Sequence, residues 1–100
     1  MQVLREGRKA TVLVTGRIDA YSAPEFAEGL WVAAEGTEDL TLDFADLEYI
    51  SSSGLRAVML AIKTMAKQGE MRITHVKASV YETLEATGFT GVCDVETAGD

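Results

Sequence analysis

Hydrophobic and polar residues alternate in several segments of this chain, and alternation is typical of β-strands that bury one face. Lys9–Gly16 alternates in this way, with its more apolar residues at even-numbered positions. Together with Gln2–Arg5 and the intervening Glu6-Gly7-Arg8, this segment predicts an antiparallel hairpin. Further strands are predicted over Asp39–Phe44, Met71–Val76 and Val92–Glu96.

Between these strands, apolar residues recur every three or four positions, which is the spacing of one face of a helix. Ser22-Ala23-Pro24-Glu25 predicts a helix start, because serine can cap, the glutamate can reach back and proline suits the first turn. Gly36 is predicted to end this helix. A second helix follows Ser51–Gly54 and closes at Gly69. Its buried stripe is predicted to comprise Leu55, Val58, Met59, Ile62 and Met65.

A third helix is predicted near the C-terminal end. Ser79-Val80-Tyr81-Glu82 repeats the capping pattern, and Gly88 is the expected left-handed stop. Phe89 should then pack back on Leu84, as is common at such helix ends. Ala45–Ile50, between the predicted strand Asp39–Phe44 and the serines, is predicted to be a linker.

The order of predicted elements is hairpin, helix, strand, helix, strand, helix and a last short strand. Strands that alternate with helices form parallel crossover units, whereas the strands of a hairpin are antiparallel. We therefore expect an α/β fold: one domain over residues 1–100, with a mixed, mostly parallel sheet of four or five strands, an N-terminal hairpin and packed helices.

The composition agrees with an ordinary soluble globular protein, since 47% of the residues are hydrophobic and 25% are charged. The single cysteine, Cys93, and the single histidine, His75, exclude an internal disulfide and a four-cysteine zinc site. We expect no metal and no cofactor. No apolar run approaches the roughly 18–20 residues that span a membrane, and no secretory signal pattern opens the chain. We therefore expect a cytoplasmic protein without membrane insertion.

The formal net charge of −7 disfavours binding to nucleic acid or to an anionic membrane. Charge also alternates by segment. Residues 1–17 carry a net +3, residues 18–50 hold nine acids and no base, residues 51–77 carry a net +4, and the last 23 residues hold five acids. This pattern fits either solvated faces or a surface whose charges steer a protein partner.

A run of three serines and a glycine, Ser51-Ser52-Ser53-Gly54, lies beyond a predicted strand and opens the second helix. Serines before a helix are commonly caps that contribute about 1 kcal/mol each. One cap needs only one hydroxyl, however, and the preceding Tyr49-Ile50 is apolar. Because functional loops gather at the carboxyl ends of parallel strands, this turn is also a candidate functional site.

The residues around this turn resemble the STAS domain of bacterial anti-sigma factor antagonists. Leu40–Phe44 followed by Leu47–Leu55 is similar to that family's strand and to its Asp-Ser-Ser-Gly-Leu turn, which opens a helix. Gly16-Arg17-Ile18-Asp19-Ala20 resembles an earlier family segment, and Leu84–Phe89 resembles the final helix and turn. The similarity covers nearly the whole chain, with the motifs in the family's order and spacing.

The resemblance implies a phosphorylation-switched binding module rather than an enzyme, so no catalytic residue is expected. The family's phosphorylated serine maps onto Ser52. The partner is an anti-sigma factor that is itself a serine/threonine kinase, and a metal-dependent serine phosphatase reverses its reaction. In that family the unphosphorylated antagonist binds the anti-sigma factor and frees a sigma factor for transcription. The expected partner-binding residues are Asp19, Tyr49, Ser51, Ser52, Ser53, Gly54 and Arg56.

The sequence departs from the family pattern at two positions. Ser51 replaces the usual aspartate, and Arg56 stands where small residues are frequent. The first departure favours an alternative function, that of an unphosphorylated STAS scaffold or subunit, for example in a lipid-transport complex. A phosphate on Ser52 would add about −1.5 to −2 charges at a helix N-terminus. Arg56, one turn onward, could meet this phosphate or stay solvated.

Other chemistry has less support from the sequence. A serine hydrolase is disfavoured because the Gly-x-Ser-x-Gly elbow is absent and His75 lies inside a predicted strand, on the same side as Met71 and Ile73. A small-ligand sensor rests only on the helix N-terminus, whose amides could hold a phosphate weakly. Cys93 is expected to pack as a small hydrophobe. Trp31 is expected to pack in the interior or at an edge, with an interface role as the alternative.

Overall fold

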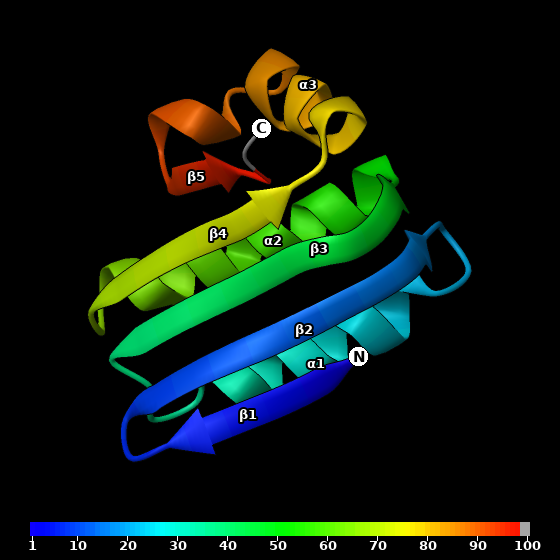
Figure 1. The fold of residues 1–100 in the computed structure, drawn as a ribbon. Helices are drawn as coiled ribbons and strands as arrows, with labels where there is room; N and C mark the ends of the chain where they lie inside the picture. Colours follow the sequence, from blue (N-terminus) through cyan, green and yellow to red (C-terminus); the bar gives the residue numbers. More distant parts are fainter. Residues whose placement is uncertain (99–100) are drawn as a thin grey trace.

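One mixed sheet organises the fold, as the computed structural model of residues 1–98 shows (Figure 1). Its strands are β1 (Gln2–Glu6), β2 (Lys9–Ile18), β3 (Asp39–Ile50), β4 (Glu70–Val76) and β5 (Asp94–Thr97). They follow chain order across the sheet, with β1 antiparallel to β2 and each later neighbouring pair parallel. The predicted α/β class and N-terminal hairpin are confirmed. The last two residues of the domain predicted over 1–100 lie outside the described residues.

Helices connect the parallel strands. They are α1 (Ala23–Ala34), α2 (Ser52–Ala66) and α3 (Ala78–Ala86), and a short 3-10 helix, Phe89–Gly91, precedes β5. Figure 1 shows α1 and α2 side by side behind the sheet, whereas α3 lies beyond β4 at the end of the sheet that holds β5. Within residues 1–98, no helix combines the length and apolar character that a membrane crossing needs.

Most of the core lies between the sheet and the α1–α2 pair, and α3 adds Val80 and Leu84. The predicted alternation in β2 is confirmed, since its even-numbered residues from Ala10 to Val14 are buried and those between them are half-buried. The predicted stripe of α2 also faces the core, with Val58 and Met65 fully buried. The largest fully buried side chains include Leu30, Leu40, Leu42, Phe44, Leu47, Ile73 and Leu84. Burying one such side chain contributes about 1.5–3 kcal/mol.

The predicted linker Ala45–Ile50 is wrong, because this segment is the second half of β3. Phe44, Leu47 and Ile50 are buried but stand three residues apart, which does not match the two-residue period of a strand. The pairing with β2 explains the spacing. Its register shifts twice, between Leu13 and Thr15 and again between Gly16 and Arg17, and each shift adds one residue on β3. Two bulges therefore restore the buried face.

Two predicted helix caps are also wrong. Ser22 precedes α1 but makes no side-chain cap bond to it. Ser79 lies inside the first turn of α3, whose N-terminal cap residue is Lys77. The predicted stop is confirmed, since Gly88 has a φ of +85° in the left-handed region that glycine adopts without strain. Leu84, inside α3, and Phe89, which follows the stop, are both buried.

The predicted positions of His75 and Trp31 are corrected by the structure. His75 does not share a side with Ile73, because its backbone has a φ of +58° and turns its side chain to the surface. The register of β4 and β5 shifts at this point, so that the next residue, Val76, is buried instead. Trp31 is not in the interior, since it is 68% exposed.

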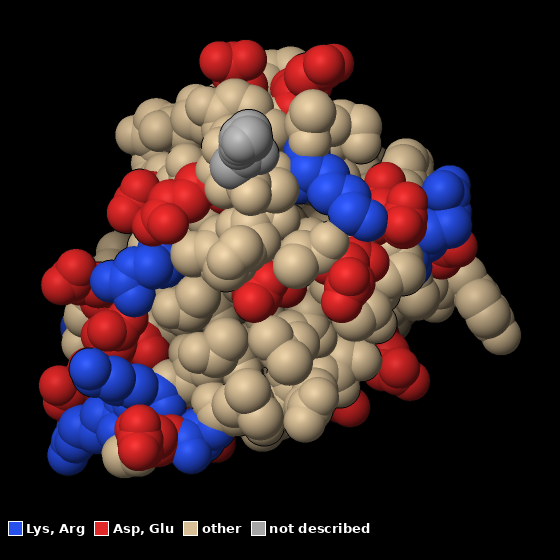
Figure 2. Space-filling view, in the orientation of Figure 1, with Lys and Arg blue, Asp and Glu red and all other residues tan. Residues whose placement is uncertain are grey.

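Ion pairs across neighbouring strands and loops account for part of the segmental charge alternation. Arg8 pairs with Glu38 at 2.9 Å, and Arg72 pairs with Asp39 at 2.7 Å, a contact that raises the pKa of the Arg72 guanidinium. Figure 2 shows charges of both signs gathered where the β1–β2 turn lies, at the lower left of the sheet. These basic and acidic segments therefore meet inside one chain.

Candidate functional site

The serine turn, Ser51–Gly54, joins the end of β3 to α2. Ser51 is the N-terminal cap residue, with extended backbone, and its hydroxyl accepts a hydrogen bond from the N–H of Gly54 at 3.2 Å. Serine and aspartate are both among the best cap residues, because each presents an oxygen to the free N–H groups of the first turn. Ser51 therefore performs the capping that an aspartate at this position would perform.

Ser52 is the first helical residue of α2 and is exposed. Within residues 1–98, its hydroxyl takes part in no hydrogen bond to protein, since Ser51 already supplies the cap. Ser53 is half-buried and lines a shallow groove that separates α2 from the start of α1. The turn thus presents one solvent-facing hydroxyl at a helix N-terminus, where a negative charge is stabilised by the helix dipole.

A second turn, Asp19–Ser22, lies beside the serine turn. The N–H of Ser51 donates to the carbonyl oxygen of Ile18 at 2.7 Å, so Asp19 follows directly after this bridge. The Asp19 carboxylate accepts from the N–H groups of Tyr21 and Ser22 at 3.0 and 2.9 Å. Hydrogen bonds from Ser22 lower the pKa of Asp19 below its usual value. Asp19 and the serine turn are therefore neighbours in the structure.

Gly54 allows the first turn of α2 to pack tightly on the strand ends. It is buried, and a Cβ at this position would lie 2.7 Å from Cγ1 of Ile50 and 2.8 Å from Cγ2 of Ile18. No side chain larger than hydrogen fits at these distances without a shift of the neighbours. The glycine therefore fixes how closely the serine turn approaches β2 and β3.

Tyr49 is 42% exposed, and its ring is covered by Arg17 from β2, whose guanidinium carbon lies 4.6 Å from the ring centroid. This cation–π contact holds an aromatic and a cation together near the turn. Arg17 was not predicted from the sequence, and neither was Tyr21, which is 95% exposed in the neighbouring turn. The signal for Tyr21 was an aromatic residue inside an otherwise polar turn segment.

Arg56 lies on the exposed side of α2, one turn after Ser52. It lines the same shallow groove as Ser53, together with Pro24 of α1 and Leu60 of α2. Within the described part of the chain, it forms no ion pair, so its guanidinium is available to a new anion.

All the residues predicted for the site are thus gathered around the carboxyl ends of β2 and β3, the usual position of functional loops in α/β sheets. With Arg17 added, their chemistry is that of a contact surface with one accessible serine hydroxyl, two cations and one carboxylate. No group of three His, Cys, Asp or Glu side chains within residues 1–98 is arranged to hold a metal ion.

The fold and the site define a small α/β module in which the serine turn joins a parallel strand to a helix. A family model described as the STAS domain matches residues 2–98, and the chain belongs to the STAS domain family. The resemblance seen in the sequence is confirmed.

Known proteins similar to the chain include an anti-sigma-B factor antagonist of Bacillus subtilis, which is 29% identical over 90 residues, 89% of this chain and 83% of that protein. A crystal structure of an anti-sigma factor antagonist from Mycobacterium paratuberculosis has a TM-score of 0.85 at 20% identity and covers 95% of this chain and 82% of that one. The Bacillus cell fate determinant SpoIIAA in its phosphorylated form has a TM-score of 0.73 at 14% identity, covering 96% and 90%. The two structures share the fold of this chain.

Proposed function

We propose that this STAS domain is an anti-sigma factor antagonist whose partner binding is switched by phosphorylation of Ser52. The observation that carries the proposal is the division of roles within the serine turn. Ser51 caps α2, which leaves Ser52 exposed at the helix N-terminus without a structural role. The name of the B. subtilis relative supports the antagonist function, and the phosphorylated SpoIIAA supports the compatibility of this fold with a phosphate.

In this proposal the domain supplies the acceptor and its partner supplies catalysis, so the domain is a binding module and not an enzyme. An anti-sigma factor of the serine/threonine kinase type would transfer the γ-phosphoryl group of ATP to Oγ of Ser52. The new bond between Oγ and the γ-phosphorus forms as the bond from the γ-phosphorus to the oxygen that bridges it to the β-phosphorus breaks, and ADP leaves. The hydroxyl proton of Ser52 passes to a base of the kinase. A metal-dependent serine phosphatase would reverse the modification by hydrolysis.

The switch follows from charge at the contact surface. The phosphate adds about −1.5 to −2 charges, which the N-terminus of α2 and Arg56 would stabilise in the free domain. A partner that covers the turn must instead bury a dianion. A loss of about 3 kcal/mol weakens binding more than 100-fold, which is enough for a switch. The proposed contact surface comprises Asp19, Tyr49, Ser51, Ser52, Ser53, Gly54 and Arg56.

The second candidate function is an unphosphorylated STAS scaffold or subunit, favoured by Ser51 at the usual aspartate position. The capping geometry of Ser51 weakens that argument, because the turn keeps its shape without the carboxylate. The switch function requires a cytoplasmic protein, since sigma factors act on transcription.

Intact-mass measurement after incubation with ATP, Mg²⁺ and a kinase-type anti-sigma factor of the same host tests the proposal. We expect one added phosphate that maps to Ser52 and is absent from Ser52→Ala. Ser53→Ala is the matched control, because it removes the neighbouring hydroxyl and should still be modified. Failure of every host kinase of this type to modify the protein, together with its copurification in a membrane complex, would support the scaffold function instead.

A further inference from the structure

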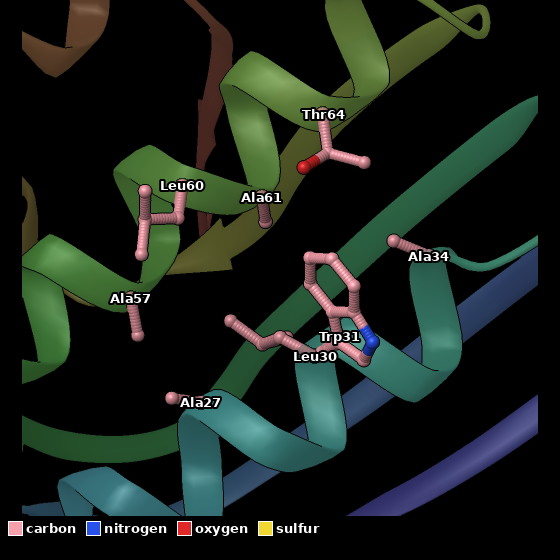
Figure 3. A pocket seen from close by; sticks show the side chains of 8 residues that line it. All are labelled: Ala27, Leu30, Trp31, Ala34, Ala57, Leu60, Ala61 and Thr64. Carbon is pink, nitrogen blue, oxygen red and sulfur yellow. The ribbon is translucent and has the colours of Figure 1, made fainter.

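An apolar pocket of about 60 Å³ lies between α1 and α2 on the side away from the sheet. Figure 3 shows Trp31 projecting from α1 toward α2, with Leu60 on the opposite wall. Both side chains are large and exposed, at 68% and 58%, while small residues such as Ala27 and Ala57 also line the pocket. An exposed tryptophan beside an open apolar pocket is typical of a protein interface, where aromatic residues are enriched.

Each of the two apolar side chains is flanked by charges of one sign. On α1, Glu28 lies three residues before Trp31 on the same stripe of the helix, and Glu35, the cap residue that follows the helix, is the next acid beyond Trp31. On α2, all the charged residues on the stripe of Leu60 are basic. These bases are Arg56, Lys63 and Lys67. Within residues 1–98, none of these five charged side chains is in an ion pair, in contrast to the paired charges at the strand ends.

The two helices run in the same direction, and their charged stripes lie at matching positions along the helix axes. Near the start of both helices, Pro24 and Arg56 line one groove, and further along Ala34 and Thr64 line the next pocket. The side-chain amide of Gln68 donates to the carbonyl of Ala34 at 2.9 Å, which ties the ends of the helices together. The α1–α2 face therefore has an acidic side and a basic side, with the apolar pocket along the line between them.

We propose that this face binds a second copy of the chain, with a two-fold axis that runs along the pocket, parallel to the helices. This axis lays α1 of each copy over α2 of the other, so that the acidic stripe of one copy meets the basic stripe of its partner at both contacts. A two-fold axis across the helices would instead lay α1 over α1, with acid against acid. The charge pattern therefore selects the first arrangement.

In this arrangement Trp31 of each copy packs against the Leu60 side of the other copy and is thereby removed from water. Glu28 of each copy faces the basic stripe of the other, which includes Lys63. The net charge of −7 on each copy opposes association at long range. A small interface under such repulsion gives a weak dimer that forms at high protein concentration. The inference rests on the chain alone and does not depend on the modification of Ser52.

Analytical ultracentrifugation of the purified protein, from low micromolar to near-millimolar concentration, tests the dimer. We expect the wild type to dimerise with rising concentration and Trp31→Ala to stay monomeric. Because the chain has one tryptophan, the emission of Trp31 should shift to shorter wavelength over the same concentration range. A wild type that stays monomeric throughout, or a Trp31→Ala variant that dimerises as well as the wild type, overturns the proposal.

Charge exchange tests the direction of the axis. Glu28→Lys and Lys63→Glu should each reduce self-association at least tenfold, because each places like charges opposite one another twice. An equimolar mixture of the two variants, and the double variant, should both recover dimerisation. The matched control is Glu82→Lys on α3, which makes the same charge change away from this face and should leave the dimer unchanged. A mixture that stays monomeric, or equal effects of Glu28→Lys and Glu82→Lys, contradicts the arrangement.

Discussion

The N–H of Ser51 donates to the carbonyl oxygen of Ile18 at 2.7 Å, and this bond joins the two turns of the site. It extends the β2–β3 pairing by one step, past the point at which Ile18 and Ile50 lie opposite one another. The serine turn and the Asp19 turn are therefore held by the sheet rather than by flexible loops. A partner that contacts Ser52 meets a surface that is already formed, which reduces the entropic cost of binding.

Replacement of the cap serine should separate its structural role from recognition. Ser51→Ala removes the acceptor for the Gly54 N–H and should lower the free energy of unfolding by about 1 kcal/mol. Ser51→Asp restores an acceptor and should stay within a few tenths of a kcal/mol of the wild type. Urea denaturation followed by circular dichroism measures both. Equal stability of the alanine and wild-type proteins would show that Ser51 is not the effective cap.

Substitution of Gly54 should be costly for a steric reason. Gly54→Ala places a methyl group against Ile18 and Ile50 at distances that require a shift of packed core atoms. Overpacking of this kind costs about 1–3 kcal/mol, and we expect a loss of that size in the free energy of unfolding. Gly91→Ala is the control, since a Cβ there meets open space and its φ is not positive. Similar stabilities of the two variants would contradict the packing described.

The turn that contains Asp19 should depend on pH. Because hydrogen bonds lower the pKa of Asp19 in the folded state, its carboxylate stabilises the fold above the unfolded value near 3.8, and this contribution disappears as pH falls through the lower folded value. At pH 7 the urea concentration at the midpoint of unfolding should therefore be higher for the wild type than for Asp19→Asn. The difference between the two midpoints should disappear below pH 4. Glu82→Gln controls for loss of one exposed carboxylate. A difference between the midpoints that grows as the pH falls would contradict a lowered pKa of Asp19 in the folded state.

The thiol of Cys93 should react slowly. The side chain is half-buried against the core, as expected for a small hydrophobe, and burial raises its pKa to about 11. About one thiol in a thousand is then ionised at pH 8, and only the thiolate attacks alkylating reagents. We expect iodoacetamide to modify the folded protein far more slowly than the protein in urea, with the rate still rising near pH 10. Equal rates in both states would show an accessible thiolate.

Local sequence patterns predicted most of the fold. Alternation and helical spacing act within a few residues, and they located the strands, the buried stripe of α2 and the left-handed stop at Gly88. They failed where tertiary pairing decides. In the second half of β3 the buried residues are three positions apart, and only the two bulges in its pairing with β2 bring them onto one face of the sheet. Likewise, the hydroxyl of Ser22 interacts with Asp19 instead of capping α1, because the β2 end brings that carboxylate within 3.1 Å.

The site was predictable to the extent that its residues are contiguous. Ser51–Gly54 stands out as a helix start with more hydroxyls than a cap needs, and the resemblance to STAS domains added Asp19. Which serine caps and which is exposed depends on the exit angle of β3, which no local pattern determines. The exposure of Trp31 was hidden for a related reason: helical spacing shows that a residue leaves the main stripe, but not whether another element covers it.

The affinity of a kinase-type anti-sigma factor for the unmodified and the Ser52-phosphorylated domain, measured by calorimetry on the same preparation, tests the central claim most directly. We predict that one phosphate weakens binding more than 100-fold while circular dichroism and the unfolding midpoint show an intact fold. Ser52→Asp should lose most of this affinity and Ser52→Ala should retain it. Equal affinity of the unmodified and phosphorylated domains would contradict the account.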